Sequence, residues 1–310
     1  MAQPLLARLH ARHPGARIDV VAPPWVAPVA RRMPEVSEVI EADLRHGELQ
    51  LGDRWRLGRK LKERGYGQAF VLPNTMKSAL APSFAGIPLR VGYLGESRVG
   101  LLNRIHKATA ARESMPLHYA RLAEEPGVEP GLPLSSSTLF FSREKVKITA
   151  ARFGISGPYT VFCPGAEYGP AKRWPYFREL ASKLGSQIVL VGSPGDLQDN
   201  QDIAGTNLIG KTTLDEAIDL IAGAVLVVSN DSGLMHVAAA TGTPQVALFG
   251  SSSPEHTPPL SPVARVVWLK VECSPCYERV CPLGHFKCMR ELSVERVLGE
   301  VRALPLQDPA

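Results

Sequence analysis

The sequence lacks the features that mark several classes of protein. Its 310 residues hold no apolar run long enough to cross a bilayer, and no basic segment with an apolar core opens the chain, so neither a membrane span nor a signal peptide is predicted. No Lys/Arg stripe, zinc-finger spacing or RNA-binding aromatic motif appears, which argues against nucleic acid as a partner. The absence of a G-x-G-x-x-G motif argues against a dinucleotide dehydrogenase. We therefore expect a cytoplasmic globular protein.

Charge and cysteine content narrow the choice of partner. The net charge of +5 suits an anionic partner, such as a nucleotide, a phosphorylated glycolipid or a membrane surface. Four of the five cysteines are crowded near the C-terminus, at Cys273, Cys276, Cys281 and Cys288. A C-x2-C pair followed by two more cysteines resembles zinc-ligand spacing, although the last two are not a second C-x2-C. A group of reduced or oxidised thiols is the alternative, and we expect no catalytic role for either.

Apolar runs rich in Val and Ile alternate with amphipathic stretches along the chain, which predicts an α/β fold with doubly wound parallel sheets. A stretch rich in Pro and Gly at 124–134 is typical of a linker, so we expect two Rossmann-like domains, 1–135 and 136–310, facing a cleft. Strands are expected at 18–23, 37–41, 68–74, 89–93, 159–165, 187–193, 225–230 and 244–250. Helices are expected at 1–13, 54–65, 75–86, 174–185, 196–205, 213–224 and 233–242.

The motif SNDSGLMH places polar residues at the end of the strand 225–230, where open α/β sheets bind ligands. Asp231 or Ser232 is suited to cap the following helix, and Gly233 lets the backbone approach a ligand. The helix N-terminus then offers N–H groups to a phosphate. Ser232 and His236 are four residues apart and share one helix face. The alternative is a plain capped helix with a core histidine.

The motif CPGAEYGPAKRWP, at 163–175, again lies between a strand and a helix. Gly165, Gly169 and Pro170 shape a tight loop, and Lys172 stands just before the helix. A lysine here is placed to meet an anion that helix N–H groups also hold. The alternative is that Lys172 and Arg173 are simply solvated. We favour a functional role, because packing alone does not explain so polar a loop at the end of a strand.

Two further loops follow strands. In VGSPGDLQDN, Asp196, or less favourably Asp199, is placed to accept hydrogen bonds from ribose hydroxyls, with a helix N-cap as the alternative for Asp196. In the loop 250–262, Ser251 to Ser253 and His256 are candidates for phosphate or sugar contacts. A structural loop is the alternative interpretation for most of them.

Taken together, NDSGLMHVAAATGTPQVALFG, CPGAEYGPAKRWP and TPPLSP resemble the ADP-heptose:lipopolysaccharide heptosyltransferases, most strongly the branch that adds a second heptose. Weaker matches such as HPGARIDVVAPPW and FAGIPLRVGYLGE extend the resemblance over nearly the whole chain. The resemblance implies a GT-B glycosyltransferase that inverts the anomeric centre. Such an enzyme moves L-glycero-D-manno-heptose from ADP-heptose to the heptosylated inner core of lipopolysaccharide. Another core heptosyltransferase is the nearby alternative.

The resemblance also implies roles for individual residues, most of them in the second domain. Lys172, Asp231 and His236 are the predicted catalytic residues, with Lys172 at the diphosphate. The predicted donor-binding residues are Gly165, Glu167, Tyr168, Asp196 (ribose), Thr212 (adenine), Ser232 and Gly233. Glu167 and Tyr168 stand where a related motif carries phosphate-binding threonines. No D-x-D motif occurs, so we expect no obligatory metal at the diphosphate and no cofactor.

The resemblance is incomplete at the start of the chain. Family members begin with a central strand and a Gly-Asp loop whose Asp is taken as the catalytic base, whereas this chain opens at the helix 1–13. Either Met1 is internal to a longer protein, or the chain is a non-catalytic ADP-sugar-binding remnant. We favour the first, because the other motifs are intact.

The residues that bind the lipid A-core glycolipid acceptor are predicted less specifically than those that bind the donor. A basic segment at 54–64 is a candidate for peripheral contact with the inner face of the inner membrane, although a solvated helix face is the alternative. Lys77 and Arg98 are candidates for contacts with acceptor phosphates.

Overall fold

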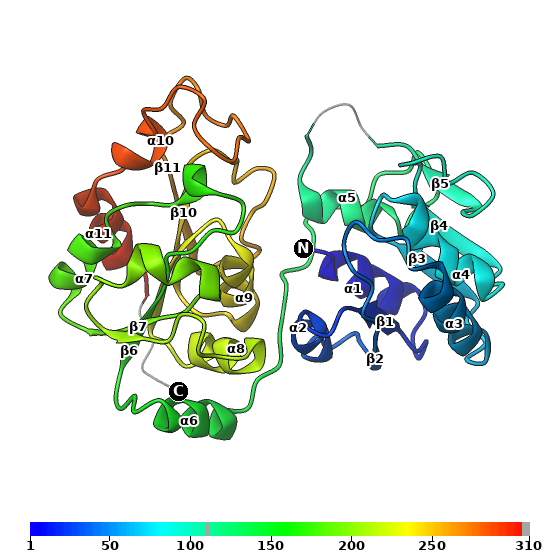
Figure 1. The fold of residues 1–310 in the computed structure, drawn as a ribbon, viewed down its shortest axis with the longest axis horizontal. Coiled ribbons are helices and arrows are strands. Elements are labelled where there is room, and N and C mark those ends of the chain that lie inside the picture. The colour runs from blue at the N-terminus through cyan, green and yellow to red at the C-terminus, as the bar shows by residue number, and fades with distance from the viewer. Residues whose placement is uncertain (109–111, 306–310) are drawn as a thin grey trace. The chain divides into compact units, whose positions relative to one another are not determined.

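A computed structural model describes residues 1–108 and 112–305. The chain divides into two compact units (Figure 1). Unit 1 comprises Met1–Arg31 and Glu35–Ser135, and unit 2 comprises Arg32–Pro34 and Ser136–Ala310. Every strand pair in both units is parallel, so the predicted α/β class with parallel sheets is confirmed.

Unit 2 contains one six-stranded sheet in the order β11-β10-β9-β6-β7-β8. Its strands are β6 (Tyr159–Cys163), β7 (Gln187–Leu190), β8 (Thr206–Asn207), β9 (Leu226–Asn230), β10 (Gln245–Phe249) and β11 (Ala264–Trp268). All residues of β6, β9 and β10 are buried, as expected for central strands covered on both faces. The polar sites that follow these strands therefore rest on the buried centre of the sheet.

Helices cover both faces of this sheet (Figure 1). They are α6 (Arg143–Arg152), α7 (Phe177–Leu184), α8 (Leu214–Ala222), α9 (Gly233–Thr241), α10 (Lys287–Arg290) and α11 (Val294–Arg302). Residues of α7 and α11 share one apolar core with β6, β7 and β10, whereas Met235 of α9 packs with Ala247 and Phe249 in a second one. Local signals agree with these helices, since Thr213 caps α8 and Gly242 ends α9 in the left-handed region.

The helix predicted at 196–205 is wrong. The structure has two short 3-10 turns there, Pro194–Asp196 and Gln198–Asn200. Polar groups satisfy one another locally, because the Asn200 amide donates to the carbonyl oxygen of Asp196 at 2.7 Å. Side-chain bonds of this kind compete with a regular helix.

Unit 1 forms two separate sheets, β1-β2 and β3-β4-β5. Its strands are β1 (Asp19–Ala22), β2 (Glu38–Glu41), β3 (Gln68–Val71), β4 (Leu89–Tyr93) and β5 (Arg104–His106). Its helices are α1 (Gln3–Arg12), α2 (Ala27–Arg31), α3 (Leu51–Lys62), α4 (Leu80–Phe84) and α5 (Met115–Arg121). The β1-β2 pair of this unit is thus not hydrogen-bonded to the other three strands.

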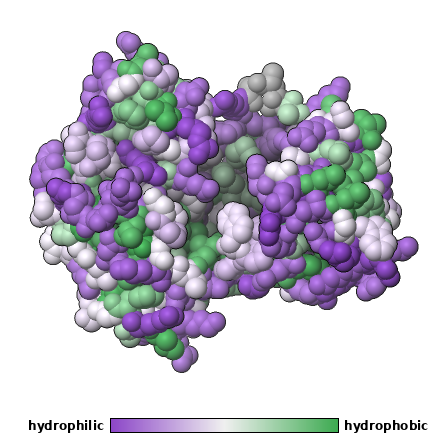
Figure 2. All heavy atoms as spheres, viewed as in Figure 1, coloured by the Kyte–Doolittle hydropathy of each residue, from purple (hydrophilic) through white to green (hydrophobic). Residues whose placement is uncertain are grey.

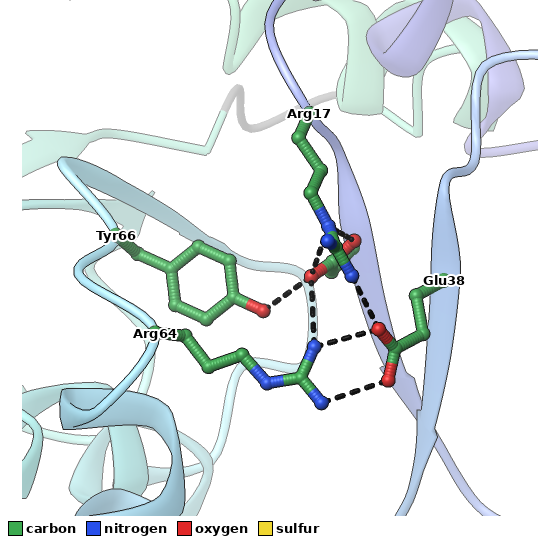
Figure 3. Close-up of polar contacts among 5 residues, drawn as sticks. Arg17, Glu38, Arg64 and Tyr66 are labelled. Atoms are coloured by element: carbon green, nitrogen blue, oxygen red, sulfur yellow. Dashed lines mark hydrogen bonds and ion pairs between the residues drawn. The ribbon is translucent and has the colours of Figure 1, made fainter.

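A cluster of polar side chains joins the two sheets of unit 1 (Figure 3). The Arg64 guanidinium, which precedes β3, donates two hydrogen bonds of 2.6 and 2.8 Å to the Glu38 carboxylate on β2. The Tyr66 hydroxyl donates to Asp19 on β1, and the Arg17 Nε donates to the same carboxylate at 2.9 Å. Arg64 is therefore engaged with acidic side chains.

The basic segment 54–64 is not one uniform solvated face. Arg54 is only 4% exposed, and it donates to the carbonyl oxygens of Leu49 and Lys77 at 2.7 and 2.9 Å. Arg56, Arg59, Lys60 and Lys62 are exposed. The expected membrane-facing role thus does not fit Arg54, whose charge is used inside the unit.

Arg98, predicted to meet acceptor phosphate, has a structural role instead. It is fully buried, and its guanidinium donates to the carbonyl oxygens of Pro73, at 2.6 Å, and Tyr93. A side chain committed in this way is not available to a ligand, so the prediction for Arg98 is wrong. The reason is that an arginine before a turn looks the same in sequence whether it faces solvent or its own backbone.

The surface is largely polar. Hydrophilic residues cover most of the face shown in Figure 2, and hydrophobic residues appear as scattered patches between them. In the part of the chain that the structure describes, no helix is long and apolar enough to cross a membrane.

Candidate functional site

The predicted site residues of unit 2 follow neighbouring strands. In the sheet order, β9 lies between β10 and β6, so the loops that follow these three strands emerge side by side at one edge. They are the loop 164–176 after β6, residues 231–232 after β9 and the loop 250–257 after β10. This is the edge at which open parallel sheets bind ligands.

Lys172 and Asp231 form an ion pair at this edge. The Lys172 Nζ lies 2.5 Å from Oδ2 of Asp231. The Ser252 hydroxyl donates to the same oxygen at 2.5 Å, and the Thr257 hydroxyl donates to Oδ1 at 3.3 Å. The Asp231 side chain is only 4% exposed and that of Lys172 is 14% exposed. The pair is therefore held in place from three loops and is shielded from water.

Asn230, the last residue of β9, directly precedes Asp231 and forms hydrogen bonds with the loop after β6. Its Oδ1 accepts a hydrogen bond from the backbone N–H of Trp174 at 3.1 Å, and its Nδ2 donates to the carbonyl oxygen of Pro164 at 2.6 Å. Asn230 is fully buried. Sequence reasoning did not assign it a role, although a buried amide at the end of an apolar strand was visible in SNDSG.

Two cations lie close to the Tyr168 ring. The Lys172 Nζ is 4.9 Å from the centre of its ring and the Arg279 guanidinium is 5.3 Å from it, which are cation–π distances. Its hydroxyl donates to the carbonyl oxygen of Tyr277. Glu167 is exposed, and its carbonyl oxygen accepts a hydrogen bond from Arg279 at 3.2 Å. Arg279, which the sequence did not single out, thus holds the outer part of this loop.

Two glycines allow close approaches in the loop after β6. Gly169 has a φ of +144°, and a Cβ there would lie 2.4 Å from the carbonyl oxygen of Arg279. A Cβ at Gly165 would lie 2.2 Å from the Asp196 carboxyl group. Gly169 therefore requires glycine, because its neighbour is backbone and its φ is positive, whereas a side chain at position 165 would displace the Asp196 carboxyl group.

Asp196 closes a turn in this structure. Its Oδ2 accepts hydrogen bonds from the backbone N–H and the hydroxyl of Ser193, at 3.0 and 2.7 Å. Ser193 holds the N-cap position and Asp196 is the third residue of that turn, so the expected N-cap by Asp196 is not formed, and contact with ribose stays a prediction. Thr212 is half-buried in the segment between β8 and α8, and its place beside adenine also stays a prediction.

The N-terminus of α9 has no side-chain cap. Ser232 occupies the N-cap position without such a bond, and its hydroxyl lies 3.3 Å from that of Ser229. Gly233 is exposed, and a Cβ there would meet nothing within 4 Å. Asp231 is engaged with Lys172, so the expected cap by Asp231 or Ser232 is not formed. The first N–H groups of α9 are thereby left without a side-chain acceptor.

His236 lies one turn into α9 and is half-buried. Burial is the largest influence on the pKa of its imidazole and lowers it, whereas the Asp231 carboxylate raises it. The net direction is downward, so the ring is neutral near pH 7.

The comparisons with known proteins identify the class. The model of glycosyltransferase family 9 (heptosyltransferase) matches residues 54–287. Lipopolysaccharide heptosyltransferase 2 of Escherichia coli (strain K12) is 44% identical, over 100% of this chain and 96% of that protein. Lipooligosaccharide heptosyltransferase 2 of Haemophilus influenzae is 42% identical, over 87% of this chain and 84% of that protein. The chain therefore belongs to glycosyltransferase family 9 and is a glycosyltransferase.

A solved structure agrees with this class. The structure of E. coli ADP-heptose lipopolysaccharide heptosyltransferase II has a TM-score of 0.85 at 42% identity, covering 97% of this chain and 93% of that one. The predicted resemblance is confirmed, and within the family this chain is heptosyltransferase II-like.

Proposed function

We propose that this enzyme moves L-glycero-D-manno-heptose from ADP-heptose to the first heptose of the inner lipopolysaccharide core. The names of its full-length relatives support the substrate class. The observation that carries the proposal is the shielded Lys172–Asp231 pair beside the uncapped N-terminus of α9. Together they offer a fixed cation and free N–H groups to one anionic ligand.

Departure of ADP is the step that this geometry assists. As the bond between the anomeric carbon and the diphosphate breaks, negative charge develops on the diphosphate oxygens. Lys172 and the first N–H groups of α9 stabilise that charge, and Asp231 keeps Lys172 in position until the donor binds. Because the protein supplies this charge, we propose that transfer needs no added divalent cation.

The donor sugar and the acceptor complete the proposal. We assign to Ser232, Gly233 and the neutral His236 the contacts near the diphosphate and the heptose, and to Asp196 and Thr212 the contacts with adenosine. Transfer with inversion requires the acceptor hydroxyl to attack from the face opposite the diphosphate and to lose its proton to a base. The acceptor is a lipid-anchored glycolipid, so we place the reaction at the cytoplasmic face of the inner membrane.

Substitution of Lys172 tests the proposal. One charge-assisted hydrogen bond contributes about 1.5–3 kcal/mol, so Lys172→Ala should weaken ADP binding about 10-fold to 100-fold and lower the rate of heptose transfer at least as much. Titration calorimetry with ADP measures the first effect. Transfer from ADP-heptose to acceptors carrying one or two heptoses, without added Mg²⁺, measures the second and the acceptor preference.

The matched control is Lys183→Ala, which removes an exposed lysine on α7 that pairs with Glu179 and Glu295. This variant should bind ADP and transfer heptose as the wild type does. If Lys172→Ala bound ADP as tightly as the wild type does, the assignment of Lys172 to the donor site would be refuted. Transfer only to the acceptor with two heptoses would replace the proposed acceptor.

A further inference from the structure

The proposed donor site gives none of the five cysteines a role, and four of them lie close together in the sequence. Cys273, Cys276 and Cys281 lie in the segment 269–286 between β11 and α10, and Cys288 lies in α10. All four are free thiols, and so is Cys163, which is buried in β6. Four thiols in sixteen residues call for a physical reason beyond packing.

These four cysteines line one small cavity. Its volume is about 20 Å³, and Ser251, Leu283 and His285 also border it. A space of this size is close to that of a single water molecule, so it suits one atom-sized guest and excludes a small organic ligand. The cavity therefore has the composition and the size of a site for one metal ion.

A second observation points into the same cavity. The Ser251 side chain is 1% exposed, and its Oγ has no hydrogen-bond partner among the described residues. A buried hydroxyl without a partner is costly, and a thiolate bound to a metal would give it an acceptor. His285 is a weaker candidate as a ligand, because its Nδ1 already accepts a hydrogen bond from the Lys287 backbone N–H at 3.1 Å.

The backbone that carries the cysteines is held around the cavity. The Ser274 hydroxyl donates to the carbonyl oxygen of Gly250 at 2.6 Å and accepts from the Trp268 indole at 2.9 Å. Tyr277, directly after Cys276, and Phe286 have φ values of +58° and +51°. Such values in residues other than glycine persist where the surroundings fix the turn. The two pairs of cysteines are thereby brought to one place by turns that are anchored to β10 and β11.

We propose that Cys273, Cys276, Cys281 and Cys288 bind one thiophilic divalent metal ion, with zinc as the favoured ion, in a tetrahedral four-sulfur site. Among the described residues, no group of three Cys, His, Asp or Glu side chains yet stands at ligand geometry. Binding must therefore draw the sulfurs inward, to about 2.3 Å from the ion. Since all four already border the same cavity, side-chain rotations and small shifts of the segment 269–286 provide this movement. Each thiol releases its proton as its sulfur bonds to the metal.

The metal site has a consequence for the donor site, and this consequence rests on the proposed function. Arg279 lies between the two cysteine pairs, and its carbonyl oxygen accepts a hydrogen bond from the Ala171 backbone N–H at 3.1 Å. The carbonyl oxygen of Tyr277 accepts a hydrogen bond from the Tyr168 hydroxyl. A metal ion that fixes this segment would therefore also fix the loop that carries Lys172.

Metal content and cobalt spectra of the full chain test the binding step directly. Protein purified under reducing conditions should contain about one zinc per chain. After removal of the metal, added Co²⁺ should give the thiolate charge-transfer and tetrahedral ligand-field bands of a four-sulfur site, and one equivalent of Zn²⁺ should displace it. Absence of these bands in the reduced wild-type protein would overturn the proposal, and so would a Cys273–Cys276 disulfide in protein purified under reducing conditions.

Variants identify the ligands. Cys276→Ser and Cys281→Ser should each lose the four-sulfur cobalt spectrum, whereas Cys163→Ser and His285→Ala should keep it. If His285→Ala lost the spectrum and Cys281→Ser kept it, His285 and not Cys281 would be the ligand, and the four-sulfur site would be refuted. A cysteine variant that misfolds would give no information about the ligands. The cobalt spectrum of the wild-type protein would still test whether the four-sulfur site exists.

The effect on the donor site has its own measurement. ADP affinity by titration calorimetry should fall at least 3-fold when zinc is removed and return when it is restored. Unchanged affinity would remove the link between the two sites while the metal site stands. A four-sulfur spectrum in a protein that does not bind ADP at all would instead count against the proposed function alone.

Discussion

At the scale of single residues, Asp231 shows how one side chain organises a site. Its two oxygens accept hydrogen bonds from Lys172, Ser252 and Thr257, which come from two different loops. The carboxylate is almost fully buried, so its interactions with these donors are screened little by water. We therefore regard Asp231 as the residue that positions Lys172.

Asp231→Asn should lower kcat at least 10-fold, because the neutral amide no longer holds the Lys172 ammonium in one position. ADP affinity should change less than 3-fold, since the substitution also removes a negative charge near the diphosphate. Steady-state kinetics and calorimetry separate the two effects. Asp202→Asn, at an exposed residue of unit 2 paired with Arg178, is the control. A wild-type kcat in Asp231→Asn would refute the positioning role.

Glu38 provides a prediction of pH dependence. Its hydrogen bonds from Arg64 lower the pKa of the carboxyl group from 4.5 to about 2. A carboxyl group whose pKa is lower in the folded state stabilises that state above its unfolded pKa, and the stabilisation is lost as the pH falls through the folded value. The contribution of Glu38 is therefore complete above pH 4.5 and disappears between pH 4.5 and about 2.

Comparison with Glu38→Gln measures this contribution. The difference in urea midpoint between the wild type and the variant should be constant from pH 7 to pH 5 and should shrink as the pH falls toward 2. Glu48→Gln, at an exposed residue on the loop before α3, serves as the control and should show no such trend. A difference between wild type and Glu38→Gln that is independent of pH would contradict the assigned ion pair.

At the scale of elements, the loops after β6 and β9 differ in what they tolerate. Gly169→Ala should destabilise the fold by about 1–3 kcal/mol, because alanine is strained at a φ of +144° and its Cβ would contact the carbonyl oxygen of Arg279. Gly233→Ala should leave the stability unchanged, since its Cβ meets nothing in the protein. Urea unfolding measures both.

The Gly233→Ala variant also tests whether a ligand contacts the N-terminus of α9. If the diphosphate contacts the backbone at Gly233, Gly233→Ala should weaken ADP binding severalfold in a protein of unchanged stability. Tight ADP binding by this variant would place the diphosphate elsewhere.

The strands and their order in the chain were the elements that the sequence predicted best. Runs such as VLVVSN begin with four consecutive apolar residues, a pattern typical of a strand buried on both faces. The helix expected at 196–205 failed because its few apolar residues do not outweigh the local bonds of Asp196 and Asn200. Strands β5, β8 and β11 were not predicted, and neither were helices α2, α5, α6, α10 and α11. Ser142 and Ser293 were available as N-cap signals for α6 and α11.

The candidate site was predictable only in part, for a similar reason. The sequence places Lys172 and Asp231 at strand ends, and the sheet order then brings them together. No local pattern shows that Asn230 bonds to Trp174, or that Arg279 reaches Tyr168, because these pairs lie 56 and 111 residues apart in the chain. The burial of Arg98 depends likewise on backbone turns that only the folded chain defines.

At the scale of the whole molecule, the two units differ in how their sheets are built. All residues of β9 are buried in the six-stranded sheet of unit 2, whereas Val21 of β1 is 42% exposed in a sheet of two strands. Small sheets bury less apolar surface and leave more edge groups open to solvent. We therefore expect unit 1 to be the less stable unit.

Hydrogen exchange followed by mass spectrometry tests this expectation. Peptides from β1 and β2 should exchange at least 10-fold faster than peptides from β6 and β9, and ADP should slow exchange mainly in unit 2. Equal protection of β1 and β9 would show that the interruption of the sheet costs unit 1 no local stability.

The fluorescence of Trp174 should report on the donor site, because its backbone N–H is hydrogen-bonded to Asn230. Trp174 is buried, donates its indole N–H to the carbonyl oxygen of Leu292 at 2.8 Å, and has its backbone amide bound by the residue next to Asp231. Trp25 and Trp55 are exposed and lie in unit 1. Trp268 on β11 is half-buried, so Trp174 is the most deeply buried of the four tryptophans. The most blue-shifted part of the intrinsic fluorescence therefore comes from Trp174, in the loop that carries Lys172, and a nucleotide titration can be followed through it without any label.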